Sequence, residues 1–322
     1  MKKRIVISGG SGFVGRNLVE YFKNIVKTYD FTFISRANDS DFNSIGWNSI
    51  GEIISLNSQI FLHLAGKAHD LKRVNNSDEY FKINHDLTVQ LFEVFLKSTA
   101  SKFIFISSVK ASADSLSGIL SEEMIPSPQT AYGKSKLKAE ESIQKMLLEF
   151  NLTSPNSKKQ LYILRPCMIH GPGNKGNLNL LYKLVRLSIP WPLAAFENKR
   201  SFLSIENFCF VIDKIIEGEI ESGVYQVADD DPVSTNDLIK LIGLGIGKKS
   251  VLIRIPKVIV NIIAKLGDIL KFPINTERLV KLTESYLVSN SKLTKALGVS
   301  LPVKSKDGLI KTIQSFNSIN TK

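Results

Sequence analysis

The stretch IVISGGSGFVG, residues 5–15, decides the fold of this chain. The β-branched run at residues 3–8 stops at glycines, which predicts a strand that ends there. Apolar side chains then recur at the spacing of one helix face, at Val14, Leu18, Val19 and Phe22. A strand, a glycine-rich loop and a helix in this order are the context in which such a loop binds the pyrophosphate of a dinucleotide.

The glycines indicate where that contact lies. Gly9, Gly12 and Gly15 form a G-x-x-G-x-x-G pattern, and with Gly10 the loop also satisfies G-x-G-x-x-G. Without side chains the backbone can approach a pyrophosphate, whose charge the helix N-terminus meets. We therefore expect cofactor contacts from Gly9, Gly12, Phe13, Val14 and Gly15.

Strands and helices continue to alternate after this unit. Apolar runs predict further strands at residues 31–35, 59–65, 102–106 and 161–164, with helices at 80–96 and 131–150. Strands that are apolar on both faces and alternate with helices indicate a parallel sheet covered on both sides. The fold class is therefore α/β, a Rossmann-type doubly wound parallel sheet.

The second half is less regular and predicts a smaller C-terminal substrate lobe. A strand is expected at Val224–Val227, and Ser234 caps a helix that begins near Thr235. We expect an NAD(P)-binding Rossmann domain over residues 1–168, with a return segment near 201–228. The substrate-binding lobe then covers residues 169–322.

Composition limits the partners. The 322 residues have a formal net charge of +12, which favours anionic partners. No dense basic run with interleaved aromatics is present, so nucleic acid is not expected. The two cysteines, Cys167 and Cys209, form neither a disulfide framework nor a metal site. A phosphorylated metabolite and an anionic membrane surface remain candidate partners, and a generally basic solvated surface is the default interpretation of the charge.

The apolar stretch at residues 251–270 is expected to be a buried or surface-lying helix. It carries Arg254, Lys257, Lys265 and Asp268, so stable membrane insertion is not expected. The N-terminus has no apolar segment of secretory length. These features together predict a cytoplasmic protein.

The second predicted strand bears on the choice of cofactor. NAD enzymes of this fold place an acidic residue at the end of that strand to bind the ribose 2′-hydroxyl. Asp30 lies about twenty residues beyond the glycines, but it precedes the strand predicted at 31–35. Arg36 follows the strand directly and offers a cation to a 2′-phosphate. We expect NADP, with NAD as the alternative.

Tyr132 and Lys136 form a Y-x-x-x-K pair at the start of the predicted helix 131–150. Residues four apart share a helix face, and an ammonium group beside a phenol lowers the pKa of the phenol from about 10. Ser108 follows the strand 102–106, whose carboxyl end is where ligands bind in such sheets. We expect Tyr132 to exchange a proton with a substrate oxygen that Ser108 also binds.

These motifs together resemble an extended short-chain dehydrogenase/reductase of the NAD-dependent epimerase/dehydratase family. The resemblance covers nearly the whole chain. It rests on GGSGFVG (9–15), HLAG (63–66), Asn84, Ser107 and Ser108, YGKSK (132–136) and RPCMIHGPG (165–173). It implies a catalytic triad of Ser108, Tyr132 and Lys136. From its place on the preceding helix, Asn84 is expected to brace the lysine through backbone or water. The resemblance also places Leu64, Ala65, Gly66, Tyr132, Lys136 and Pro166 beside the cofactor.

Extended members mostly act on nucleotide sugars, and the resemblance implies which residues bind them. Substrate contacts are expected from Ser108, Lys110, Asn177, Arg200, Arg278 and Lys281. Arginine suits a diphosphate because its donors form a planar fork. SSVKAS (107–112), RPCMIHGPGNKGN (165–177), PLAAFENKRSFLSIEN (192–207) and VYQVADDDPVST (224–235) are similar to bacterial UDP-4-keto-6-deoxy-N-acetylglucosamine 4-reductases of surface-polysaccharide pathways.

Other functions remain open at this stage. A UDP-sugar 4-epimerase with tightly bound NAD needs the same triad. A 4,6-dehydratase needs carboxylates beside the serine strand, and Val109, Lys110 and Ala111 supply none. A non-catalytic NADP-binding sensor or scaffold usually lacks the Tyr/Lys pair. The chain departs from the family at His170 and Ser112, which we expect to line the substrate side, and a homodimer is possible.

Overall fold

The computed structural model describes residues 2–24, 29–35, 44–68, 77–174, 176–218, 220–270 and 275–319. Its strands are β1 (Lys3–Ser8), β2 (Tyr29–Ser35), β3 (Ser44–Gly46), β4 (Ile60–His63), β5 (Lys102–Ile106), β6 (Ile119–Leu120), β7 (Gln160–Pro166), β8 (Met168–His170), β9 (Phe202–Ser204), β10 (Gly223–Val227) and β11 (Leu287–Val288). Its α-helices are α1 (Phe13–Asn24), α2 (Ser77–Phe81), α3 (Leu87–Lys97), α4 (Ala131–Thr153), α5 (Asn177–Arg186), α6 (Ile205–Glu217), α7 (Thr235–Gly245), α8 (Lys257–Leu270), α9 (Thr276–Thr283), α10 (Ser291–Leu297) and α11 (Ser305–Ile319). Two 3-10 segments, η1 (Trp47–Leu56) and η3 (Val109–Ala111), and a π-helical turn, η2 (Lys82–Asp86), complete the elements.

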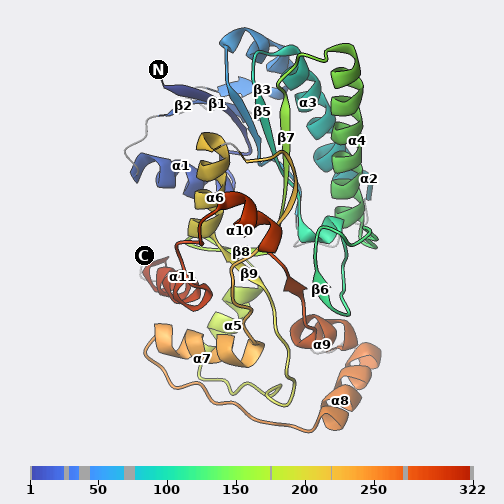
Figure 1. The fold of residues 1–322 in the computed structure, drawn as a ribbon. Coiled ribbons are helices and arrows are strands. Elements are labelled where there is room, and N and C mark those ends of the chain that lie inside the picture. The colour runs from blue at the N-terminus through green and yellow to red at the C-terminus, as the bar shows by residue number, and fades with distance from the viewer. Residues whose placement is uncertain are drawn as a thin grey trace.

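A seven-stranded sheet forms the centre of the N-terminal half. Its strand order is β10-β7-β5-β4-β1-β2-β3, and each neighbouring pair is parallel. Figure 1 shows α3 and α4 on one face of the sheet and α1 and α6 on the other. This arrangement confirms the Rossmann-type doubly wound sheet. The order reverses between β1 and β4, which places the glycine loop and residues 64–66 at the switch point where such folds bind ligands.

The strands are apolar on both faces because two cores lie against them. In β1, Ile5 and Ile7 pack in the core formed with α1 and α6. Val6 between them packs in the opposite core, with Phe92 and Phe95 of α3. Successive side chains of a strand point to opposite faces, so a sheet with two covers needs an unbroken apolar run.

Several element boundaries differ from the sequence predictions. The second strand begins at Tyr29, so Asp30 lies inside it and not before it. Asp30 pairs with Arg4 at 3.5 Å, at the amino end of β2 and far from the cofactor end. The helix predicted at 80–96 is α2 and α3 joined by the π-helical turn η2, which displaces the helical register at Asn84.

The C-terminal half contains a third apolar core, built from α5, α7, α8, α9 and α11. Figure 1 places these helices beyond the carboxyl ends of the sheet strands. The chain returns to the main sheet through β10, which pairs with β7, and through α6, which packs on α1. The division of the chain into domains at residue 168 stays a prediction. Among the described helices, none combines the length and apolarity that crossing a bilayer requires.

The tight turn after β1 generates a prediction on stability. Gly9 has φ of +76°, and a Cβ there would lie 2.6 Å from the amide nitrogen of Ala65. Gly9→Ala combines backbone strain with this clash, so the free energy of unfolding should fall by about 1–3 kcal/mol in urea titrations. Gly51→Ala is the control, since no heavy atom lies within 4 Å of its Cβ position. An equal loss in both variants would contradict the steric argument.

Candidate active site

The three residues expected to be catalytic meet at the carboxyl end of β5. Ser108 follows this strand and begins η3, where its hydroxyl accepts a hydrogen bond from the amide of Lys110 at 3.2 Å. Tyr132 lies in the first turn of α4, which Thr130 caps by accepting from the amide of Gly133. The Tyr132 and Ser108 side chains share a hydrogen bond.

One face of α4 is joined to the chain segment that leaves β5. Lys136, one turn after Tyr132, is 4% exposed and its Nζ donates to the carbonyl oxygen of Ile106 at 2.9 Å. One turn further, Glu140 accepts a short hydrogen bond from the hydroxyl of Ser107. Residues at intervals of four share a helix face. One face of α4 therefore binds three successive residues at the end of β5. Lys136 binds Ile106, Glu140 binds Ser107 and Tyr132 binds Ser108.

Burial controls the protonation of this group. Burial raises the pKa of Tyr132 above its ordinary value of 10.0, while the hydrogen bond from Ser108 opposes the rise. Burial also lowers the pKa of Lys136 to about 8, against an opposing contribution from Glu140. The expected lowering of the Tyr132 pKa is therefore not found, because burial raises this pKa and the opposing contribution comes from Ser108. At neutral pH Tyr132 keeps its proton and Lys136 is mostly charged.

Asn84 binds the segments next to Lys136. Its side chain accepts from the amide of Lys67 at 2.7 Å and donates to the hydroxyl of Ser135 at 2.9 Å. It thereby connects η2 to the loop after β4 and to α4. Gly66 lies between these groups, since a Cβ there would be 2.9 Å from the Lys136 Nζ. Bracing of Lys136 through backbone or water stays a prediction. Asn84 is buried within a π-helical turn. The spacing of apolar residues in the sequence does not reveal such a turn.

The glycine loop suits a dinucleotide. A side chain at Gly9 would strike the backbone of Ala65, and one at Gly15 would lie 2.5 Å from the carbonyl oxygen of Gly10. Phe13 and Val14 begin α1, so the free amides of the helix N-terminus face the loop. The amides of Leu64 and Ala65 bind the carbonyl and hydroxyl oxygens of Ser8, which aligns the two strand ends. The residues present therefore fit an NAD(P) pyrophosphate.

Pro166 and Arg36 are the other residues expected beside the cofactor. Pro166 ends β7 beside Val227 of β10, at the carboxyl edge of the sheet. Arg36 lies outside the described residues. His63 was missed as a structural residue: it is fully buried and its ring bridges the hydroxyls of Ser8 and Thr88. Burial, followed by the charge of Lys136, lowers its pKa to about 3, so its ring stays neutral.

A second cluster of charges lies on the substrate side of η3. The Nζ of Lys110 donates to the carbonyl oxygen of Asp114 at 2.6 Å and lies 4.6 Å from the ring centre of Tyr286. Burial lowers the pKa of Lys110; Asp114 and Glu284 raise it, and the nearby cations Arg200 and Lys281 lower it further. The structure thus brings Lys110, Arg200 and Lys281 close enough to influence one another.

Glu284 partly neutralises this cation cluster. The guanidinium of Arg200 donates to the Glu284 carbonyl oxygen at 3.0 Å and lies 4.0 Å from its carboxylate. Lys281 is ion-paired with Glu277 on the surface of α9. Arg278 is exposed on the same helix, and its backbone amide donates to the side chain of the N-cap residue Asn275. The side chain of Asn177 lies outside the description.

Two residues that we expected on the substrate side, Ser112 and His170, are buried inside the protein. Ser112 is fully buried and accepts from Arg165 at 2.8 Å, so it does not line the substrate side. His170 is also fully buried, and its Nδ1 bonds to Thr312 of α11 at 2.8 Å. Both expectations are wrong, because Ser112 is buried against Arg165 of β7 and His170 against α11.

Arg165 and Glu140 form a buried ion pair that sequence reasoning missed. The guanidinium Nε lies 3.0 and 3.1 Å from the two carboxylate oxygens, and both side chains are almost fully buried. The sequence contained an indication of this pair: Glu140 follows Lys136 by one helical turn, and Arg165 comes at the end of an apolar strand. The pair fixes α4 to β7.

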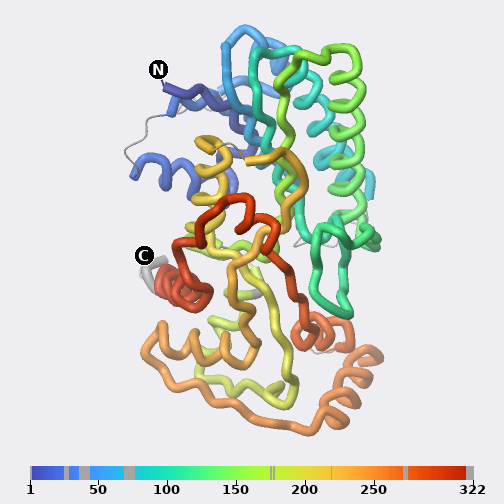
Figure 2. Tube along the Cα trace, viewed as in Figure 1, coloured from blue at the N-terminus to red at the C-terminus, as the bar shows by residue number. Residues whose placement is uncertain are grey.

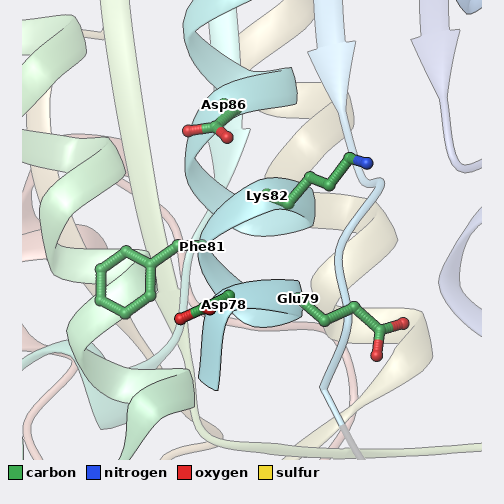
Figure 3. Close-up of a pocket in the computed structure, with 5 residues that line it drawn as sticks. All are labelled: Asp78, Glu79, Phe81, Lys82 and Asp86. Carbon is green, nitrogen blue, oxygen red and sulfur yellow. The ribbon is translucent and has the colours of Figure 1, made fainter. Parts of the chain in front are cut away.

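A depression in the surface lies on α2 and η2, and none of the triad residues lines it. Its lining residues are Asp78, Glu79, Phe81, Lys82 and Asp86. Figure 3 shows that these side chains spread from successive helical positions and do not converge on one point. A substrate site needs convergent polar groups, so the chemistry of the triad locates the active site better than this depression.

Known proteins resemble the chain along its whole length. It is 27% identical over 337 residues to UDP-glucose 4-epimerase of Vibrio cholerae, covering 100% of this chain and 98% of that protein. It is 22% identical to GDP-6-deoxy-D-mannose reductase of Pseudomonas aeruginosa, covering 75% and 80%. The Bordetella bronchiseptica enzyme WbmG, solved with NAD and UDP, has a TM-score of 0.76 at 16% identity, covering 100% and 97%. Residues 5–228 match the NAD dependent epimerase/dehydratase family. The chain therefore belongs to this family of extended short-chain dehydrogenases/reductases.

Proposed function

We propose that this enzyme reduces the 4-keto group of a UDP-linked 6-deoxy sugar with NADPH, in the biosynthesis of a surface polysaccharide. The observation that carries the proposal is a protonated Tyr132, hydrogen-bonded to Ser108 at the end of β5 and one turn before Lys136. Reduction of a ketone needs an acid at the carbonyl oxygen, and a raised tyrosine pKa keeps that proton available. The likeness to a GDP-6-deoxy-D-mannose reductase supports this direction of reaction.

In the proposed reaction each residue of the triad has one task. Bound NADPH supplies the hydride that reduces C4. Ser108 donates a hydrogen bond to the C4 oxygen, and Tyr132 transfers its proton to that oxygen as negative charge develops. Lys136, oriented by the Ile106 carbonyl, is the nearby cation that stabilises the resulting phenolate.

We assign the substrate diphosphate to the cation cluster of Lys110, Arg200 and Lys281. Lys110 and Arg200 are partly buried, so each is more effective than a fully solvated cation because the local dielectric is lower; Lys281 lies exposed on α9. Arg200 offers a planar fork that a diphosphate can engage in competition with Glu284. The similarity to a UDP-glucose 4-epimerase supports uridine as the base. Contacts from Asn177 and Arg278, the cytoplasmic location and a homodimer stay predictions.

A 4-epimerase with tightly held NAD is the second candidate. The 27% identity to the Vibrio cholerae epimerase, over the full length of both chains, favours it. Such an enzyme uses the same triad and returns the hydride to the opposite face of C4. A 4,6-dehydratase is less well supported, because Val109, Lys110 and Ala111 carry no carboxylate and Glu140 is occupied by Arg165. A non-catalytic sensor would have no need of the triad.

The first test removes the proton donor. Tyr132→Phe should lower the turnover of a UDP-4-keto sugar by about 10²–10⁴-fold, because general acid catalysis is lost. NADPH binding, followed by fluorescence titration, should be little changed. Tyr80→Phe is the control, because it removes a neighbouring hydroxyl while keeping the ring that contacts Tyr132 and the proposed donor itself. Wild-type turnover in Tyr132→Phe would contradict the assignment.

The second test separates the reductase from the epimerase. With UDP-4-keto-6-deoxy-N-acetylglucosamine, the purified protein should oxidise NADPH in an amount equal to the sugar reduced. The loss of absorbance at the nicotinamide band and the mass of the product measure this. Retained NAD in the purified protein, with interconversion of UDP-sugars and no net NADPH consumption, would select the epimerase instead.

The third test concerns the cofactor phosphate. We propose NADP because Arg36 directly follows β2 and no carboxylate lies at residues 34–37. A charge-assisted contact with the 2′-phosphate corresponds to about a tenfold to hundredfold preference for NADPH. Arg36→Asp should weaken NADPH binding by this factor and leave NADH binding unchanged or improved, as dissociation constants for both cofactors will show. Unaltered NADPH affinity would remove the support for NADP.

A further inference from the structure

Helix α8 has an outer apolar face that no described part of the chain covers. Its inner residues Val260, Ala264 and Gly267 are buried, and the helix packs against α9 and the core of the C-terminal half. Seven large apolar side chains are 44–76% exposed: Val258, Ile259, Ile262, Ile263, Leu266, Ile269 and Leu270. They recur at intervals of three and four residues, which places them along one side of the helix.

Other exposed apolar groups lie in the segments next to this face. Figures 1 and 2 place α8 at the end of the protein farthest from the N-terminal strands. Val251 and Ile253, in the segment before the helix, and Val280 on α9 are also about half exposed. Contiguous apolar patches of this kind are uncommon on a soluble protein and mark an interaction surface.

The charges around the patch select the partner. Residues 248–281 have eight Lys or Arg and two Asp or Glu, in a chain whose net charge is +12. Both carboxylates are engaged within the protein: Asp268 accepts from the amide of Thr276 at 3.0 Å, and Glu277 pairs with Lys281. Exposed cations such as Arg254, Lys257 and Lys265 therefore dominate the field next to the apolar side chains. A second copy of the chain would present like charge, whereas an anionic lipid surface presents the complement.

We propose that α8 docks this protein on an anionic bilayer, with its outer face in the interfacial region and its cations among the lipid phosphates. A helix of 14 residues is roughly 21 Å long and is too short to cross the hydrocarbon core, so it lies along the surface. Its inner residues remain packed against α9, which carries Lys281 of the cation cluster. The membrane surface is thereby one helix away from the proposed substrate diphosphate site, although docking does not depend on the proposed reaction.

Flotation of the full-length protein with lipid vesicles tests this inference. Vesicles of phosphatidylglycerol and phosphatidylcholine should carry the protein upward in a density gradient, and vesicles of phosphatidylcholine alone should carry much less. The double variant Ile262→Asp with Leu266→Asp should bind at least about tenfold more weakly, because it places charge on the outer face that enters the bilayer. The matched control is Leu148→Asp with Leu152→Asp, an exposed pair at the same spacing on α4.

Further measurements keep the outcome decisive. Circular dichroism and NADPH binding check that the variants fold; should the apolar pair fail to fold, Lys257→Glu with Lys265→Glu tests the same surface and should lose about fivefold or more in affinity per residue. The inference is overturned if the wild-type protein ignores anionic vesicles, or if both double variants float like the wild type. It is also overturned if sedimentation shows a dimer that the α8 variant dissociates, since the face would then bind a second copy.

Discussion

The buried ion pair between Glu140 and Arg165 is the constraint on which the geometry of the site depends. It fixes α4 to β7, while the hydroxyl of Ser107 binds the same carboxylate from the end of β5. Taking both charges out of water is costly, and such pairs seldom add net stability. Here the pair holds the face of α4 that also carries Tyr132 and Lys136. Breaking it by removing one partner would leave an uncompensated charge beside the catalytic lysine.

The same packing that orders the triad also sets its protonation. Lys136 is buried and Tyr132 is partly buried, and desolvation favours the neutral form of each. The tyrosine consequently retains its proton. The lysine keeps its charge at neutral pH, although its pKa of about 8 lies only slightly above that pH. An acid and a cation are thus prepared side by side before any substrate arrives, which is the preorganisation that lowers the cost of charge development.

The two halves of the molecule handle charge in different ways. In the sheet half, charged groups near the site are buried, paired and fixed by hydrogen bonds. On the substrate side, Lys110 of the sheet half and Arg200 and Lys281 of the C-terminal half form a cation cluster that is only partly neutralised, and α8 exposes apolar side chains beside further cations. An excess of positive charge around a partly open site suits an anionic substrate and, in the inference above, an anionic surface.

The sequence by itself determined the nucleotide-binding unit, the parallel sheet and the Ser, Tyr and Lys motif, because each depends on local spacing: glycines in one loop, apolar runs, and residues four apart on a helix. The register of Asn84 could not be predicted, since a π-helical turn interrupts an otherwise helical pattern. Only the tertiary structure decided that Ser112 and His170 are buried, that Glu140 pairs with Arg165, and that burial raises the pKa of Tyr132. These features depend on which segments, distant in the chain, cover a side chain and remove it from water, and no local pattern of residues contains that information.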